Sequence, residues 1–210
     1  MLTRSRRRSP ATLAILATLC LLGACTTPAR LQSDYQGPVP AMTAGHRPMA
    51  LQVEILDRQG QRFPANNVAR TQYLQLAESA FARAGWVLAP DASLTVRILL
   101  VGRTPEGLIA SEASLGRNLA TGLLSLNIAC KEWTHRVDAA GEVTILQGDT
   151  VLADQAIDLA GTATSCFSTI NPSWLANHQQ AAIDTYQQVV QDQLAKILEL
   201  VTATALTEAS

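Results

Sequence analysis

The sequence predicts an α+β domain in which a small mixed or antiparallel sheet carries its helices on one face. Three observations support this class: a strand–helix–strand order early in the chain, a tight-turn signal between two strands in the middle, and a long amphipathic helix near the C-terminus. Each element has one apolar face to bury, and packing helices on a sheet buries both kinds. We expect a single domain over residues 50–205.

The first unit has the order strand, helix, strand. Residues 51–56 alternate between apolar and polar side chains, which predicts a strand. Asn66 or Asn67 offers a helix N-cap, and Gly85 stands where a helix commonly ends. A second strand region covers residues 86–88 and 94–101, and its later part is rich enough in β-branched residues to be central in the sheet.

Residues 128–164 predict antiparallel strands. The tight-turn signal is Gln-Gly-Asp-Thr at residues 147–150, between two short apolar stretches. Residues 138–141 are either another turn or a bulge within one long strand, and the pattern does not decide between them.

The C-terminal segment predicts a long helix that starts near Asn177, after a turn at Asn171-Pro172. The apolar stripe is too short for a coiled coil, so we expect it to pack on the sheet. Its members recur three or four residues apart: Ile183, Tyr186, Val190, Leu194, Ile197 and Val201.

Residues 1–24 predict a signal peptide. Four arginines precede an apolar run over residues 11–24, which is shorter than the roughly 20 residues that span a bilayer. The run ends Leu-Gly-Ala-Cys at residues 22–25, which resembles the lipobox of bacterial lipoproteins. That resemblance implies cleavage before Cys25 and acylation of its thiol and its new amine, a stable membrane anchor. The alternative is a secreted protein whose cleavage site contains a cysteine by chance.

Residues 25–49 predict the lipidated cysteine and a flexible tether, because prolines and glycines are frequent and apolar residues are few. Thr26 follows the cysteine. In the enteric-type sorting of lipoproteins, an Asp at this place signals retention in the inner membrane. The resemblance therefore implies an outer-membrane anchor, with the domain facing the periplasm.

The charge distribution argues against a nucleic-acid partner. The net charge is −1, but removal of the four leader arginines leaves 12 basic against 17 acidic side chains. Nucleic-acid binding requires clustered basic residues, which the remaining chain lacks.

Cys130 and Cys166 predict a disulfide bond. For a hairpin that turns at residues 148–149, opposite residues have numbers that sum to 297, and these two sum to 296. One residue of bulge would place them opposite each other, and such a bond persists in an exported domain. The alternatives are free thiols or a metal site that includes His135, although closely spaced ligand pairs are absent from the sequence.

Residues 102–126 are rich in small and apolar residues, and two interpretations stay open. One is a mobile loop with a short helix folded onto the sheet. The other is a partly exposed apolar surface that contacts a membrane or a protein partner. The residues of this candidate surface recur at helical spacing: Leu115, Leu119, Leu123 and Leu126.

No catalytic, phosphate-binding or cofactor motif occurs in the sequence, so we expect neither an enzyme nor a cofactor. His135 is expected on the solvent face of a strand, and His178 as surface or cap decoration at a helix start. The competing hypothesis is a periplasmic small-ligand-binding protein or hydrolase with a pocket lined by Trp133, His135 and nearby carboxylates.

The order of elements, together with the lipobox, is similar to the layout of lipopolysaccharide-assembly and TraT-type lipoproteins. That resemblance implies an accessory role, without chemistry, in an outer-membrane or periplasmic complex with an envelope protein partner. A mainly structural envelope protein without a single ligand is a third hypothesis. Fold analogy alone does not choose among the three.

Overall fold

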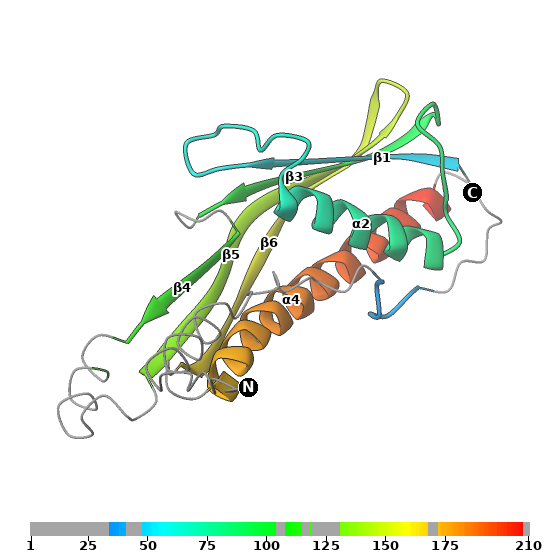
Figure 1. Ribbon diagram of the computed structural model, residues 1–210. Helices are drawn as coiled ribbons and strands as arrows, with labels where there is room; N and C mark the ends of the chain where they lie inside the picture. The colour runs from blue at the N-terminus through cyan, green and yellow to red at the C-terminus, as the bar shows by residue number, and fades with distance from the viewer. Residues whose placement is uncertain are drawn as a thin grey trace, which may run out of the picture.

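The computed structural model describes residues 34–40, 48–103, 108–114, 118, 131–167 and 172–207. Over these residues a mixed sheet carries two helices on one face, which confirms the predicted α+β class (Figure 1). The strands are β1 (Pro48–Leu56), β2 (Val87–Leu88), β3 (Leu94–Gly102), β4 (Ile109–Ala113), β5 (Lys131–Gln147) and β6 (Thr150–Phe167); the helices are α2 (Val68–Arg83) and α4 (Pro172–Thr207).

The expected strand–helix–strand unit lies within the first four elements, β1, α2, β2 and β3. β1 and β3 are parallel neighbours, and β3 also pairs with β5, so β3 is central as predicted. Asn67 is the N-cap of α2, since its side-chain oxygen accepts a hydrogen bond from the Arg70 backbone N–H at 3.2 Å. After α2, Gly85 has a φ of 86°, the left-handed conformation that glycine adopts at helix ends.

β5 and β6 form one long antiparallel hairpin, which resolves the open question about residues 138–141. β5 continues through them as a single strand of 17 residues. The hairpin turns at Gly148, whose φ of 59° suits glycine. β3 and β4 pair with successive stretches of one edge of β5, and β6 pairs with the other edge. The sequence did not predict β4.

α4 lies along the hairpin and packs against α2 as well (Figure 1). It begins at Pro172, five residues before the predicted start, because proline is well tolerated in the first turn of a helix. Ile183 is only half-buried. The rest of the predicted stripe is confirmed as core: Tyr186, Val190, Leu194, Ile197 and Val201.

Two glycines allow close packing at the middle of the hairpin. A Cβ at Gly161 would overlap the Val189 side chain of α4. A Cβ at Gly141 would lie 2.8 Å from the Leu99 carbonyl oxygen of β3, closer than real Cβ contacts. Larger residues at either position would force β6 away from α4 or β5 away from β3.

Part of the predicted tether is packed on the domain, so that prediction is wrong for these residues. Tyr35 is fully buried, its N–H donates to Ser79 Oγ at 3.1 Å, and the Arg83 guanidinium donates to its carbonyl and lies over its ring. β1 already begins at Pro48, followed by the fully buried Met49. Burial of apolar side chains stabilises the folded state even where they belong to a proline-rich stretch.

Among the described helices, none has the length and apolar character needed to span a bilayer.

Candidate functional site

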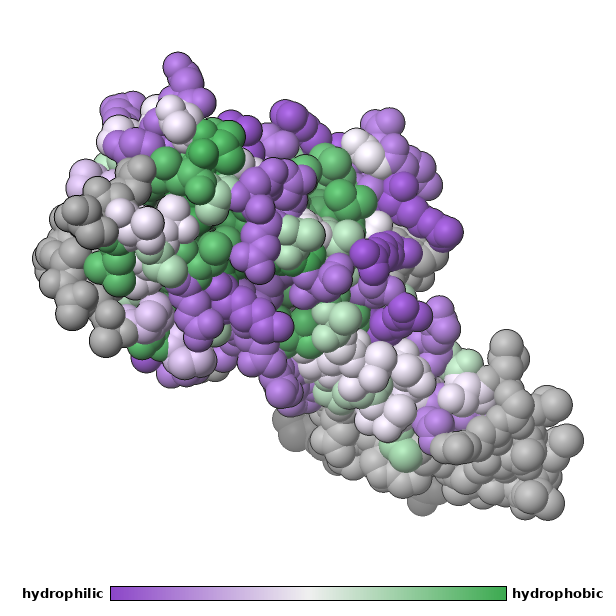
Figure 2. All heavy atoms as spheres, turned by 180° about the vertical axis from the view of Figure 1, so that it is seen from behind, coloured by the Kyte–Doolittle hydropathy of each residue, from purple (hydrophilic) through white to green (hydrophobic). Residues whose placement is uncertain are grey.

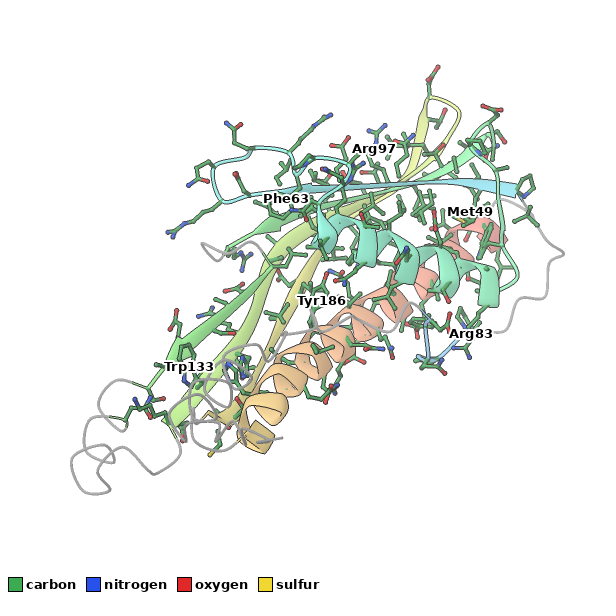
Figure 3. All side chains as sticks on the ribbon, viewed as in Figure 1. Met49, Phe63, Arg83, Arg97, Trp133 and Tyr186 are labelled. Atoms are coloured by element: carbon green, nitrogen blue, oxygen red, sulfur yellow. The ribbon has the colours of Figure 1, made fainter. Side chains whose placement is uncertain are left out.

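A cluster of polar and aromatic side chains joins four elements at one end of the molecule. Figure 3 shows Trp133 at this end, with Met49 and Arg83 at the opposite end. We name it the histidine cluster; its members come from β4, β5, β6 and the start of α4, and are Ser111, Trp133, His135, Ser165 and His178.

The Ser165 hydroxyl lies between the two imidazoles. Its Oγ is 2.7 Å from His135 Nε2 and 2.9 Å from His178 Nδ1. On the other side of the His135 ring, Nδ1 is 2.9 Å from Ser111 Oγ. The His178 ring is tilted against His135, with centroids 4.7 Å apart, and stands edge-on to Trp133 at 5.3 Å. One continuous hydrogen-bond chain therefore connects β4, β5, β6 and α4.

Burial favours the neutral form of both histidines. It lowers the pKa of His135, and the neighbouring His178 lowers it further through charge repulsion. Burial also lowers the pKa of His178. With both rings neutral, each of the three contacts can hold one proton, because a hydroxyl can donate to one partner while it accepts from another.

Both predictions for the histidine side chains are wrong. His135 is fully buried, because odd-numbered residues of β5 face the helices, as Val137 and Val143 also do. The parity with Val143 was a signal in the sequence that could have placed His135 inside. His178 is half-buried and packs on Trp133 from α4, a contact between distant segments that no local pattern reveals.

A groove of about 620 Å³ lies on the opposite face of the sheet, across β4, β5 and β6. The Asp138 carboxylate is only 13% exposed, accepts a hydrogen bond from Arg136 and lies 3.6 Å from the Arg103 guanidinium. Arg103 also contacts Asp158 at 3.3 Å. Figure 2 shows this side of the molecule, where much of the described surface at the narrow end is pale, which means intermediate hydropathy, with some hydrophilic residues among it.

The predicted pocket of Trp133, His135 and carboxylates does not form as one site. The groove contains Glu112 and Asp138, while His135 lies on the helix-facing side of the same strand. Neighbouring strand residues point to opposite faces, so the sheet itself separates the two groups. Among the described residues, no three His, Cys, Asp or Glu side chains come together as a metal site.

The register of β5 with β6 differs from the one on which the predicted cysteine pair is based. The bulge lies in β6, between the pairs Leu146↔Val151 and Ile145↔Ala153, and it shifts the register away from the predicted match. Cys166 consequently faces Glu132. Cys166 is disulfide-bonded, whereas Cys130 lies outside the described residues, so the pairing of the two remains a prediction.

The other predicted site residues also lie outside the described residues: Cys25, Leu115, Leu119, Leu123 and Leu126. Within residues 102–126, the structure describes residues 102–103 and 108–114, which include β4, and also Asn118. Its side-chain amide donates to the Glu132 carbonyl at 2.9 Å and accepts from the Glu132 N–H at 2.7 Å. Asn118 therefore takes the place of a strand partner where β4 has ended.

The fold and these two sites define an α+β domain with a partly buried histidine cluster on one sheet face and an open polar groove on the other. No family model and no curated protein matches the chain.

Several solved structures are similar in outline. Protein XCC0632 from Xanthomonas campestris, of the family DUF330, has a TM-score of 0.48 at 10% identity, over 86% of this chain and 98% of that one. A minor lipoprotein from Acinetobacter baumannii has a TM-score of 0.34 at 14% identity, over 76% and 95%. Rare lipoprotein B from Shewanella oneidensis has a TM-score of 0.30 at 12% identity, over 75% and 96%. Likenesses at this level leave the family open.

Proposed function

We propose that the protein is a lipid-anchored envelope protein that serves, without catalysis, as an accessory or binding component of an outer-membrane or periplasmic complex. The observation that carries this proposal is the Leu-Gly-Ala-Cys sequence at residues 22–25, after a basic region and a short apolar run. The lipid on Cys25 attaches the domain to the outer membrane, facing the periplasm.

Replacement of the anchoring cysteine tests the attachment. We expect the Cys25→Ser variant to leave the membrane fraction of a detergent-free lysate, while the unchanged protein stays in it. A variant that still sediments with membranes would contradict the lipid anchor.

A photoreactive residue at Leu119 tests the partner surface of residues 115–126, where we expect crosslinks to one dominant envelope protein. Scattered or lipid-only crosslinks would argue against that surface.

The disulfide between Cys130 and Cys166 belongs to the same proposal, since an exported domain folds in an oxidising compartment. On the chain-entropy model, a disulfide that closes the loop from residue 130 to residue 166 stabilises the domain by about 3–4 kcal/mol. We expect no reactive thiol from either cysteine in the unfolded, unreduced mature protein. Labelling of both thiols would rule out the pair.

One observation favours a second candidate function, a hydrolase. Ser165 Oγ within 2.7 Å of His135 Nε2 is the arrangement of a nucleophile and its base, with Ser111 orienting the base from the other side. The group that orients His135 is the uncharged Ser111 rather than a carboxylate, and the groove that could hold a substrate lies on the other sheet face. We therefore rank this function second. A fluorophosphonate probe that labels the protein, and fails to label the Ser165→Ala variant, would reverse the ranking.

A further inference from the structure

β6 is an edge strand of the described sheet, and its part from Ala160 to Phe167 contains no lysine, proline or bulge to discourage pairing. Among the described strands, β6 pairs only with β5, so its second edge has no strand partner there. Natural proteins commonly protect such edges with lysine or proline. The 18 residues of β6 include neither, and they include no arginine. From Ala160 to Phe167 the strand has no charged residue at all.

Two hollows border the same short part of this edge. The groove described above lies on the sheet face away from the helices, and a second hollow of about 400 Å³ lies between β6 and α4. Both border Ala160, Gly161 and Thr162. An added strand directs successive side chains to opposite faces of the sheet, so it requires space on both sides of the edge.

The hollow beside α4 is acidic. Asp184 and Asp192 line it, both exposed, with the uncharged Gln188 midway between them. Gln180 Nε2 donates a hydrogen bond to Asp184 Oδ1 at 2.7 Å. The second carboxylate oxygen of Asp184 can still accept a hydrogen bond from a bound partner. None of the described residues that line the hollow is basic.

We propose that the β6 edge at residues 160–164 is a docking site for an extended segment of a protein partner, which adds a strand there and presents basic side chains to α4. Backbone hydrogen bonds supply affinity in this mode of recognition, and the side chains supply specificity. Asp184 and Asp192 are eight residues apart on a helix, about 12 Å. Strand residues four apart span about 13 Å, so the segment carries two Lys or Arg residues at positions i and i+4.

This inference rests on the proposed function, because it names the chemistry of the partner that the envelope protein binds. α4 runs alongside β6 in Figure 1, so the two carboxylates follow the direction that the added strand takes. A second copy of this chain fits less well, since its own β6 carries only acidic charges, Asp154 and Asp158.

The test is selection of displayed ten-residue random peptides on the full chain purified in detergent. We expect enriched peptides to combine β-branched residues with two basic residues four positions apart. Bound peptides should protect backbone amides of residues 160–164 from hydrogen exchange. Asp184→Asn should weaken binding about threefold, and the double variant with Asp192→Asn about tenfold, the range of exposed ion pairs.

The matched control is Asp91→Asn with Asp149→Asn, which removes the same charge from two exposed turns that do not line the hollow. Three outcomes would overturn the proposal: no enriched peptides, equal weakening in the control, or protection elsewhere in the chain. Self-association that the Asp184/Asp192 variant abolishes would show that a second copy is the occupant, and would also overturn it. None of these outcomes alters the result of the Cys25→Ser fractionation, so the two proposals fail separately.

Discussion

The two ends of the molecule differ in what holds them together. At the end formed by β1, β3, α2 and the second half of α4, large apolar side chains are fully buried, among them Phe81, Ile98 and Leu194. At the other end, β4, the start of β5 and the start of α4 meet through the histidine cluster. We name these the apolar end and the polar end.

This difference assigns different roles to the two ends. Burial of apolar area is the main favourable term in folding, so global stability resides in the apolar end. Hydrogen bonds contribute less in net terms, and regions held by them open more easily. The groove and the β6 edge at residues 160–164 both lie toward the polar end. We expect the segments next to them to open at a lower free energy than the apolar end. Binding regions are commonly drawn from such segments.

The largest expected effect is at the apolar end. Phe81→Ala should lower the free energy of unfolding by about 3–5 kcal/mol, because it removes a fully buried ring between α2 and the sheet. Chemical denaturation measures the loss. The matched control on the other helix is Leu206→Ala, where the side chain is 41% exposed and the change should stay within about 0.5 kcal/mol. A similar loss in both variants would contradict the location of the core.

The next effect concerns the junction of the two ends. Gly161→Ala should cost about 1–3 kcal/mol, because the added Cβ overlaps the branched Val189 side chain on α4. Thermal unfolding compares it with Thr162→Ala, a change at the exposed neighbour on the same strand. Pairing Gly161→Ala with Val189→Ala should recover part of the loss. No recovery in the double variant would mean that α4 does not pack on β6 at this point.

Removal of the Ser165 hydroxyl, which lies between the two imidazoles, tests the stability of the polar end alone. Ser165→Ala should cost about 1–2 kcal/mol, because both imidazoles lose the partner between them in a partly buried place. Hydrogen exchange should rise at residues 133–137 of β5 and stay unchanged at residues 143–147. Thr164→Ala, at the exposed neighbour, is the control. A uniform rise along β5 would refute a separate, weaker polar end.

Acidification should loosen the polar end as well, with an effect smaller than that of Ser165→Ala. Because burial lowers the pKa of His135 and His178, the folded protein binds fewer protons than the unfolded chain below about pH 6.5. Stability from the neutral cluster is therefore complete above pH 6.5 and falls as the pH drops toward the lowered pKa values. The double variant His135→Asn, His178→Asn should flatten this part of the stability profile. An unchanged slope would show that other groups cause it.

The same comparison explains what the sequence could predict. The apolar end follows local rules: the Asn67 cap, the Gly85 stop and the stripe from Tyr186 to Val201 are each visible in a window of a few residues. The polar end depends on register over long distances. The bulge near Val151 moves Cys166 opposite Glu132, and no local pattern places His178 beside His135. Contacts between segments far apart in the chain decide such sites.

The smallest expected effect separates two carboxylates that contact the same guanidinium. Asp158→Asn should change the free energy of unfolding by a few tenths of a kcal/mol, because Asp158 is 72% exposed and its contact with Arg103 is screened by water and salt. Asp138→Asn should cost more, since that carboxylate is 13% exposed and contacts Arg136 as well as Arg103. Denaturant titrations at low and high salt measure both. If the Asp158 variant lost as much as the Asp138 variant, burial would not be what distinguishes the two carboxylates, and the groove would hold its arginines through surface charge alone.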